Sequence, residues 1–493
     1  MQLRPLLLVL LSVVSATLYA QPEDQATDYL SKEFHATRRD SLRALIPDSS
    51  VVMVLAYPTR NFSNDVDYVY HPNPDLYYFT GYKEPHALLL IFKEPQTAAD
   101  GSIYKELFFI QKRDVRAEQW TGRRMGVEGV QQQLGIKMVF NGDQFNNYPI
   151  DFSKFTKIIF DALPNDLAVS RDPATLYSLV QQFKQKAGFP AENYMTDKRF
   201  GIQLYRQLTG KLREIKTPEE MDLLRKAVEI SCIGQNEVMK AVRPDMSERE
   251  IQGLHEFVHK KYGAENVGYP SIVGAGNNGC VLHYEENNKM HVENRLVLMD
   301  VGAEYHGYTA DVTRTVPANG KFTPEQRTIY EIVYNAQEEA FKLCKEGTPR
   351  AEIEKKAREV VAEGLLKLGV ISKKEESAIY YPHGLSHHIG LDVHDRGYSG
   401  QLKKNMVITI EPGIYIPENS NCDKKWWGIA VRIEDDVLIR EKDCEILSAM
   451  APRKVEDVEK MVAAKSPLDN FVLPPLKSAQ SEKAAQPAKK KAF

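Results

Sequence analysis

The spacing of apolar and polar positions differs between the two halves of the chain. In the first half, short apolar runs such as SVVMVLAY (residues 50–57) and ALLLIF (87–92) have the length and β-branched content of buried strands. Helical spacing lies between them, for example in PATLYSLVQQFKQKAG (173–188). Strands that alternate with helices predict an α/β domain with a mixed sheet, which we place at residues 25–209.

The second half is built from longer amphipathic helices with clear start signals. TPEE at Thr217 is a capping box with proline at the first helical position, and SERE at Ser247 and TPEQ at Thr323 repeat the device. We expect the helices of this half to end at Gly263, Gly347 and Gly369. The strand-like runs between and after them predict an α+β domain at 217–455, in which helices back a curved, largely antiparallel sheet.

The two ends of the chain follow neither pattern. Residues 1–20 contain Arg4, an apolar run and then small residues, which is the shape of a secretory signal peptide and too short to span a bilayer. We therefore expect an exported protein, periplasmic or secreted, without a stable membrane span after processing; an uncleaved anchor is the alternative. Residues 466–493 are poor in apolar side chains and locally basic, which predicts a disordered tail.

Charge and cysteine content exclude several kinds of partner. The net charge of −3 gives no reason to expect nucleic acid, and the KKK run in the tail does not change this. Five cysteines are few and odd in number, so they are not a disulfide framework, and no Cys-x-x-Cys pair supports a thiolate zinc site. Cys422 and Cys444 could pair across a hairpin, which would leave at least one thiol free.

Candidate chemistry lies in acids and a histidine embedded in apolar strand patterns. LVLMDVGAEYHGYTADVTRT reads as two extended segments joined by a turn, and these carry Asp300 and Asp311. A buried unpaired carboxylate costs several kcal/mol, so a cation between the two is the simplest explanation. Glu411 in MVITIEPGIYI, Glu434 in GIAVRIEDDVLI and His387 in PHGLSHHIGLDVHD share this setting.

Four carboxylates held together raise one another's pKa unless positive charge is present. Two divalent ions with one or two bridging carboxylates would neutralise all four, and oxygen ligands with one imidazole suit manganese, iron, cobalt or zinc. Two metals about 3.5–4 Å apart can hold a bridging hydroxide as nucleophile and polarise a carbonyl, which predicts a hydrolase. Taken singly, each residue is more often a turn, solvated-edge or structural residue; the five together favour the metal site.

Three further histidines surround the predicted site. His383 and His394 flank His387, and His283 lies in GCVLHYEEN. Histidine shuttles protons near neutral pH, so one of them could stabilise a tetrahedral intermediate or protonate a leaving nitrogen. His388 is the rival ligand to His387. If the segment is extended, the two side chains point to opposite faces and only one reaches the metals.

The spaced motifs HGLSHHIGLDVHD, LVLMDVGAEYHGYTADVTRTVP, TIEPGIYI and GIAVRIEDD together resemble the pita-bread metallopeptidases, and within them the Xaa-Pro aminopeptidases (aminopeptidase P). NPDLYYFTGYKEP and AEQWTGRRMG resemble the creatinase/prolidase-like N-terminal domain of that family, so the resemblance covers both predicted domains. It implies removal of an N-terminal residue that precedes proline. It also implies two divalent ions, first Mn²⁺ with Co²⁺, Zn²⁺ or Fe²⁺ as alternatives, proline-containing peptides as partners, and a homo-dimer or homo-tetramer.

The same resemblance gives the five metal ligands their roles. Asp300 would bind one ion. Asp311 and Glu434 would bridge both ions. His387 and Glu411 would complete the coordination of the other ion. No ligand of the family pattern is missing from the sequence, which argues against an inactive relative.

The remaining matches are catalytic or supporting residues. His283 and His394 match histidines that contact substrate and intermediate, and His383 matches one that lines the substrate pocket. Tyr269 and Arg432 match partners that orient the ligating carboxylates, which metal sites require.

Other interpretations stay open on the sequence alone. A prolidase, which cleaves only Xaa-Pro dipeptides, is the close alternative, and a metal-free peptide-binding relative without activity is a minor one. Methionine aminopeptidase fits less well, because the large N-terminal domain is foreign to it. The aromatic segment HPNPDLYYFTGYKEP (71–85) is either a packed loop or an interface or rim of the active site.

Overall fold

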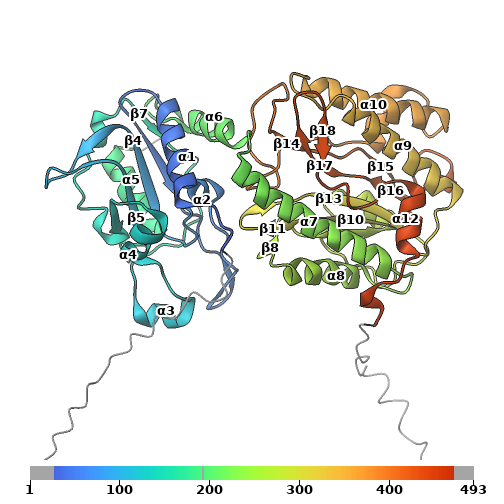
Figure 1. Cartoon of the computed structure of the whole chain (residues 1–493), viewed down its shortest axis with the longest axis horizontal. Helices are drawn as coiled ribbons and strands as arrows, with labels where there is room; N and C mark the ends of the chain where they lie inside the picture. The colour runs from blue at the N-terminus through green and yellow to red at the C-terminus, as the bar shows by residue number, and fades with distance from the viewer. Residues whose placement is uncertain (1–26, 191–193, 471–493) are drawn as a thin grey trace, which may run out of the picture.

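The computed structural model describes residues 27–190 and 194–470, so the predicted signal peptide lies outside it. Two domains lie side by side and are joined through the consecutive helices α6 (Ile202–Arg213) and α7 (Pro218–Ala241) (Figure 1). None of the helices in these ranges is long and apolar enough to cross a membrane.

The N-terminal domain is built on a five-stranded mixed sheet. Its strand order is β6 (Val139–Asn141), β5 (Ile103–Ile110), β4 (Leu88–Thr97), β1 (Ser50–Leu55) and β7 (Lys157–Ile159). The pairs β1–β7 and β5–β6 are parallel and the others are antiparallel, which confirms the predicted α/β class. Helices and a hairpin complete the domain: α1 (Lys32–Leu45), α2 (Pro74–Thr80), α3 (Val115–Thr121), α4 (Gly126–Gly129), α5 (Leu176–Ala187), β2 (Asn61–Ser63) and β3 (Val66–Asp67).

Alternation along β1 explains how both faces of this sheet are covered. Val51 and Met53 point into one core, which includes α5, whereas Val52 and Val54 point into another, which includes α1 and α2. The second core continues into the C-terminal domain, where Ile389 and Tyr308 belong to it. The two domains therefore share one apolar interior.

The C-terminal domain is an antiparallel assembly of short sheets backed by helices. Its strands are β8 (Asn266–Val267), β9 (Ile272–Ala275), β10 (Leu296–Val301), β11 (Ala303–Tyr305), β12 (Tyr308–Thr309), β13 (Val312–Pro317), β14 (Val407–Ile410), β15 (Gly413–Ile416), β16 (Ile429–Arg432), β17 (Asp435–Ile439) and β18 (Cys444–Ile446). Every strand pairing in this domain is antiparallel, as predicted.

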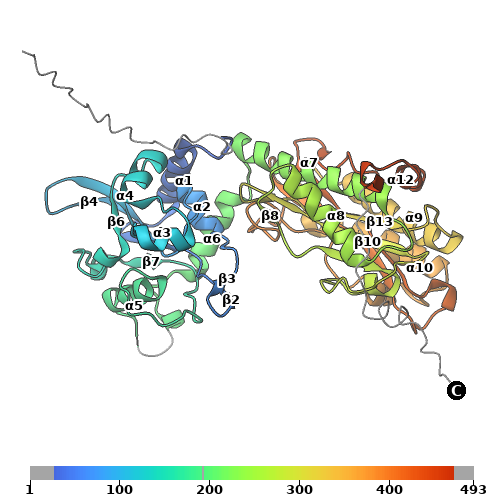
Figure 2. The same cartoon turned by 90° about the horizontal axis from the view of Figure 1, so that it is seen from below.

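The helices of this domain form two groups, and each group packs against its own set of strands. The helices are α7, α8 (Glu248–Lys261), α9 (Pro324–Phe341), α10 (Arg350–Lys367), α11 (Ser377–Tyr380) and α12 (Val455–Val462). α7 packs against β11, β12 and β13, and α8 packs against β9 (Figures 1 and 2). α9 packs against β14, β15 and β16, and α10 packs against α9. The carboxylates of the site lie where these two groups of strands meet.

The helix starts match the sequence closely, and one helix end does not. Thr217 and Thr323 form complete capping boxes, and Ser247 caps α8 through the amide of Glu250. The predicted end of α9 at Gly347 is wrong, because the helix ends at Phe341 and the chain continues in turns. Leaving the helix there lets the side chain of Cys344 enter the core.

The aromatic segment at 71–85 is not a loop. It contains α2, whose residues are all buried and whose N-cap is Asn73. Asp75 at its start accepts hydrogen bonds from Arg213 (2.8 Å) and from Arg396 of the catalytic domain (2.9 Å). The second guanidinium nitrogen of Arg213 lies 2.6 Å from Asp395, directly after His394. This segment is therefore an interface element that supports the catalytic domain.

Only the first residues of the predicted tail, up to Asn470, lie within the described part of the chain. Pro467–Asn470 forms a short 3₁₀ turn, so disorder from residue 466 onward is wrong for these residues. The rest of the predicted tail lies outside the described residues. α12, just before it, packs Val455 and Val458 into the catalytic core.

Candidate active site

The first wall of the site is the strand pair β10–β13. Asp300 on β10 is directly opposite Thr313 on β13, and Asp311 immediately precedes β13. The hydroxyl of Tyr269 lies 2.6 Å from one oxygen of each carboxylate, so it can donate to either. The turn needs a glycine at position 302, because a Cβ there would lie 1.8 Å from the carbonyl oxygen of Ala310.

The second wall comes from strand ends that are distant in sequence. Glu411 follows β14, and Glu434 lies between β16 and β17 and accepts a 2.6 Å hydrogen bond from the Thr313 hydroxyl. The Nε2 atom of His387 lies 3.5 Å from Asp311 and 3.5 Å from Glu411. Its Nδ1 atom faces the carbonyl of His388 at 3.0 Å and must donate to it, which leaves Nε2 as a free acceptor or ligand.

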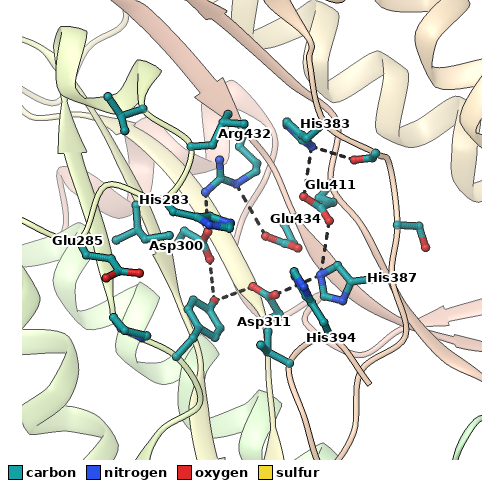
Figure 3. Close-up of a pocket in the computed structure, with 18 residues that line it drawn as sticks. His283, Glu285, Asp300, Asp311, His383, His387, His394, Glu411, Arg432 and Glu434 are labelled. Atoms are coloured by element: carbon teal, nitrogen blue, oxygen red, sulfur yellow. Dashed lines mark hydrogen bonds and ion pairs between the residues drawn. The ribbon is translucent and has the colours of Figure 1, made fainter. Parts of the chain in front are cut away.

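The five predicted ligands converge on one point (Figure 3). Asp311, His387 and Glu434 each offer an atom within 4.8 Å of the others, and no other group of this kind occurs in residues 27–190 and 194–470. Asp300 is joined to this group through the Tyr269 hydroxyl, and Glu411 through His387.

The charges of the site are unbalanced. Burial and neighbouring acids raise the pKa of Asp311 and Glu434 well above the usual range, and burial also raises the pKa of Glu411. Burial opposes ionisation of Asp300 too, but Arg432, whose Nη2 lies 2.5 Å away, holds the pKa of Asp300 below its usual value. One guanidinium cannot balance four carboxylates, so the donor set fits divalent cations.

His388 does not compete with His387 for this site. It is 2% exposed, and a Cβ on Gly397 would lie 2.2 Å from its Nε2 atom, so its ring packs against that turn. Its backbone forms bridges with Asp395 and Ile408, as in an extended segment. The alternation argument for His387 and His388 is therefore supported by their geometry.

The three other histidines line the same cavity. The ring centroid of His394 lies 4.2 Å from that of His387, and His283 lines the cavity together with Asp300 (Figure 3). His383 donates from Nδ1 to the Gly384 carbonyl and accepts at Nε2 from the hydroxyl of Tyr415 (2.8 Å). Burial lowers the pKa of His383 and of His394 to about 4, so both imidazoles are neutral near pH 7.

The cavity has a volume of about 640 Å³, within the range of small-molecule sites. All ten residues singled out from the sequence line it: Tyr269, His283, Asp300, Asp311, His383, His387, His394, Glu411, Arg432 and Glu434. The geometry thus brings the predicted set together, while the role of each residue stays a proposal.

Sequence reasoning missed several supporting residues. Tyr415 accepts a 2.8 Å hydrogen bond from Arg432 and donates to His383, so it connects these two cavity residues. Asp436 accepts from the backbone amide of Asp311, and burial raises its pKa to about 8. The solvated-edge alternative for Glu434 is excluded, because Glu434 and the neighbouring Asp435 and Asp436 are all buried.

The buried carboxylate of Glu248 holds the loop that carries His283 in place through hydrogen bonds. Glu248, the first residue of α8, accepts hydrogen bonds from the amides of Ala275 and Lys289 (both 2.8 Å) and from the hydroxyl of Tyr284 (2.9 Å). These partners lie on both sides of His283. No sequence signal identified Glu248, since its position after a capping serine is typical of surface helices.

Comparison with known proteins agrees with this site. Residues 222–441 match the model of metallopeptidase family M24, and residues 35–158 match the aminopeptidase P N-terminal domain. The chain is 34% identical to the Xaa-Pro aminopeptidase of Escherichia coli over 88% of this chain and 98% of that protein. The structure of E. coli aminopeptidase P with the inhibitor Pro-Leu matches with a TM-score of 0.77 at 32% identity, over the same shares of each chain. A zinc-substituted form with product matches at 0.76 and 32% identity, over 89% of this chain and all of that one.

Fold and site together define a two-domain metallopeptidase with the pita-bread fold. The chain belongs to metallopeptidase family M24, in the branch that carries the aminopeptidase P N-terminal domain. It is a metalloaminopeptidase.

Proposed function

We propose that this metalloaminopeptidase hydrolyses the N-terminal Xaa-Pro bond of peptides and releases the first residue. The observation that carries the proposal is the convergence of four carboxylates and one imidazole in a cavity that three further histidines line. The name of the E. coli relative supports proline specificity. Similarity to proteins named Xaa-Pro aminopeptidase over 98% of their length favours it over a prolidase.

The donor set fits two divalent ions. We assign Asp300 to one ion, Asp311 and Glu434 to a bridging position, and His387 and Glu411 to the other ion. Ions bound there supply a water activated as nucleophile and polarise the scissile carbonyl. Mn²⁺ is our first choice, with Co²⁺, Zn²⁺ and Fe²⁺ as alternatives, because oxygen-rich sites with one imidazole accept all four.

The residues of the chain orient these groups and handle the proton. Tyr269 and Arg432 hold the Asp300 carboxylate in place through hydrogen bonds of 2.6 and 2.5 Å. His283 and His394 are assigned to substrate and intermediate: a neutral imidazole can donate to a developing oxyanion or to the leaving nitrogen. His383, fixed by Tyr415, lines the pocket.

A proline-specific reaction suits this geometry. The Xaa-Pro bond is a tertiary amide without an N–H group, so peptidases that grip an extended backbone through that group lose a contact. A site that holds the substrate through metals, histidines and a shaped pocket does not depend on it. The interface element α2 contacts, through Arg213, the segment that follows His394 and so helps to hold that side of the cavity in place.

A length series of peptides tests the proposal. We expect Xaa-Pro-Yaa-Zaa to be cleaved after the first residue, and its Xaa-Ala counterpart to be cleaved far more slowly. Cleavage of the dipeptide Xaa-Pro alone would establish a prolidase. Purified protein without manganese, cobalt, iron or zinc, and without activity after any of them is added, would instead support a non-catalytic peptide-binding relative.

We also propose that the protein is exported and forms a homo-dimer or homo-tetramer. The first proposal rests on the leader-like residues 1–20 and the second on the family resemblance. Cell fractionation with N-terminal sequencing tests the first. Light scattering on the purified protein tests the second, and a monomer at micromolar concentration would contradict it.

A further inference from the structure

Two cysteine thiols from distant segments meet at the carbonyl end of α9. Cys344 lies just beyond that helix, and Cys444 is the first residue of β18. The Sγ atom of Cys344 lies 3.4 Å from the carbonyl oxygen of Ala340, and that of Cys444 lies 3.7 Å from the next carbonyl, of Phe341. The two thiols lie near enough to perturb each other: Cys444 raises the pKa of Cys344, and Cys344 lowers that of Cys444.

The backbone fixes this meeting on both sides. The amide of Glu346, two residues after Cys344, donates to the carbonyl of Arg440 at 3.0 Å. Cys444 itself is paired with Ile439 in the β17–β18 ladder. Cys444 is therefore fixed in a strand, and the turn that carries Cys344 is hydrogen-bonded to the end of β17.

We propose that Cys344 and Cys444 form a disulfide bond when the folded protein meets a disulfide oxidant. The pairing of Cys422 with Cys444 that the sequence left open is not the one the structure favours. Cys422 contacts Tyr380 and Trp427 instead. All five thiols are free in the structure, so the Cys344–Cys444 disulfide would form after folding, between two thiols that already lie near each other.

The exposure of the two thiols determines which of them reacts first. Cys344 is 1% exposed, whereas Cys444 is only partly buried, so Cys444 is the thiol that an external reagent reaches. Its thiolate attacks an external protein disulfide or oxidised glutathione and forms a mixed disulfide, releasing one external thiol. The Cys344 thiolate then attacks Sγ of Cys444 and releases the second external thiol. Two cysteine protons go to solvent or to the released thiolates, and the external disulfide takes up the two electrons.

The bond would enclose the segment 344–444, which carries His387, Glu411 and Glu434. Neither cysteine lines the catalytic cavity, so we expect stability to change and activity to remain. A cross-link of this kind acts mainly by restricting the unfolded chain, and a long enclosed segment increases the effect.

Peptide mapping tests the proposal. The full chain is incubated with oxidised glutathione, blocked with an alkylating reagent, digested without reductant and analysed by mass spectrometry. We expect one cross-linked peptide pair that joins Cys344 to Cys444, and a fall of two in the number of thiols titrated in denaturant. Unlinked Cys344 and Cys444 after complete oxidation, or a link from Cys444 to Cys422, would overturn the proposal.

Thermal unfolding gives a second, independent readout. Dithiothreitol should lower the midpoint of the oxidised wild type by about 5–10 °C. The same reagent should not change the midpoint of Cys344→Ser or Cys444→Ser. Cys422→Ser is the matched control and should keep the wild-type response. If a serine variant fails to fold, the peptide map of the wild type still decides the question.

Discussion

Burial and acidic neighbours both oppose ionisation of the Asp311 carboxylate. Its carboxylate is 5% exposed and lies close to Asp300, Asp436 and Glu411, all of which raise its pKa. Tyr269 gives it one hydrogen bond, and His387 approaches at 3.5 Å. Protein groups supply little positive charge near this carboxylate, so bound cations would contribute most of its electrostatic stabilisation.

At the residue scale, we predict that Asp311→Asn lowers kcat/KM by at least about 100-fold, because a carboxylate ligand loses its charge and one donor oxygen. The bound-metal content per chain should fall in parallel. Steady-state cleavage of an Xaa-Pro peptide and elemental analysis measure both, with the exposed Asp100→Asn as control. Activity within tenfold of the wild type would remove Asp311 from the bridging role.

The second residue-scale prediction separates catalysis from metal binding. His394→Ala should lower kcat by about 100-fold or more, as expected when a positioned proton donor is removed. Metal content should stay near that of the wild type. The exposed His291→Ala is the control. Stoichiometric loss of metal from the His394 variant would instead make His394 a ligand.

At the scale of elements, the site is assembled from strand ends, and the loop with His283 is tied to the start of α8. Local signals predicted the elements well: capping residues at Thr217, Ser247 and Thr323 begin helices as expected. The supporting contacts could not be predicted in this way. Glu248 and Tyr415 are ordinary residues in their local context, and their importance comes from partners that are distant in sequence.

We predict that Glu248→Ala lowers kcat/KM by about tenfold and destabilises the domain, because four donor groups lose their acceptor, each at a cost of about 1–3 kcal/mol at most. Glu248→Gln keeps an acceptor oxygen and should recover part of the activity. The decisive comparison is with His283→Ala. If Glu248 acts by positioning His283, the double variant should be no less active than His283→Ala, whereas additive losses would contradict the positioning role.

The second prediction at this scale concerns two buried histidines on α8. His255 and His259 are at most 1% exposed, and their ring nitrogens have no hydrogen-bond partner. Burial lowers the pKa of His259 to about 4 and that of His255 well below its usual value. Below about pH 6.5 the unfolded chain therefore takes up protons that the folded chain does not.

The free energy of unfolding should thus fall as the pH decreases from 6.5 towards 4, by up to about 1.4 kcal/mol per pH unit for each histidine. Chemical denaturation at pH 7 and pH 5 measures the effect. The variant with His255→Leu and His259→Leu should lose this part of the pH dependence, and the exposed His291→Leu should keep it. An unchanged pH dependence in the double variant would show that the two imidazoles do not titrate in this way.

At the scale of the whole molecule, one apolar core crosses from the N-terminal domain into the catalytic domain. The sequence predicted two domains and ten of the residues that line the cavity. Acids and histidines in apolar strand contexts stand out locally, whereas Tyr269 and Arg432 came from the family resemblance. It did not predict that residues 71–85 contain an interface helix or that Cys444 meets Cys344. Both features depend on how distant segments pack, which no local pattern records.

The central claim is that the carboxylates are held together by two divalent ions. Anomalous diffraction from crystals of the full chain grown with Mn²⁺ tests it most directly. We predict two manganese peaks about 3.5–4 Å apart, with Asp311 and Glu434 contacting both ions. No peak among these carboxylates, or manganese bound only elsewhere in the chain, would contradict the account.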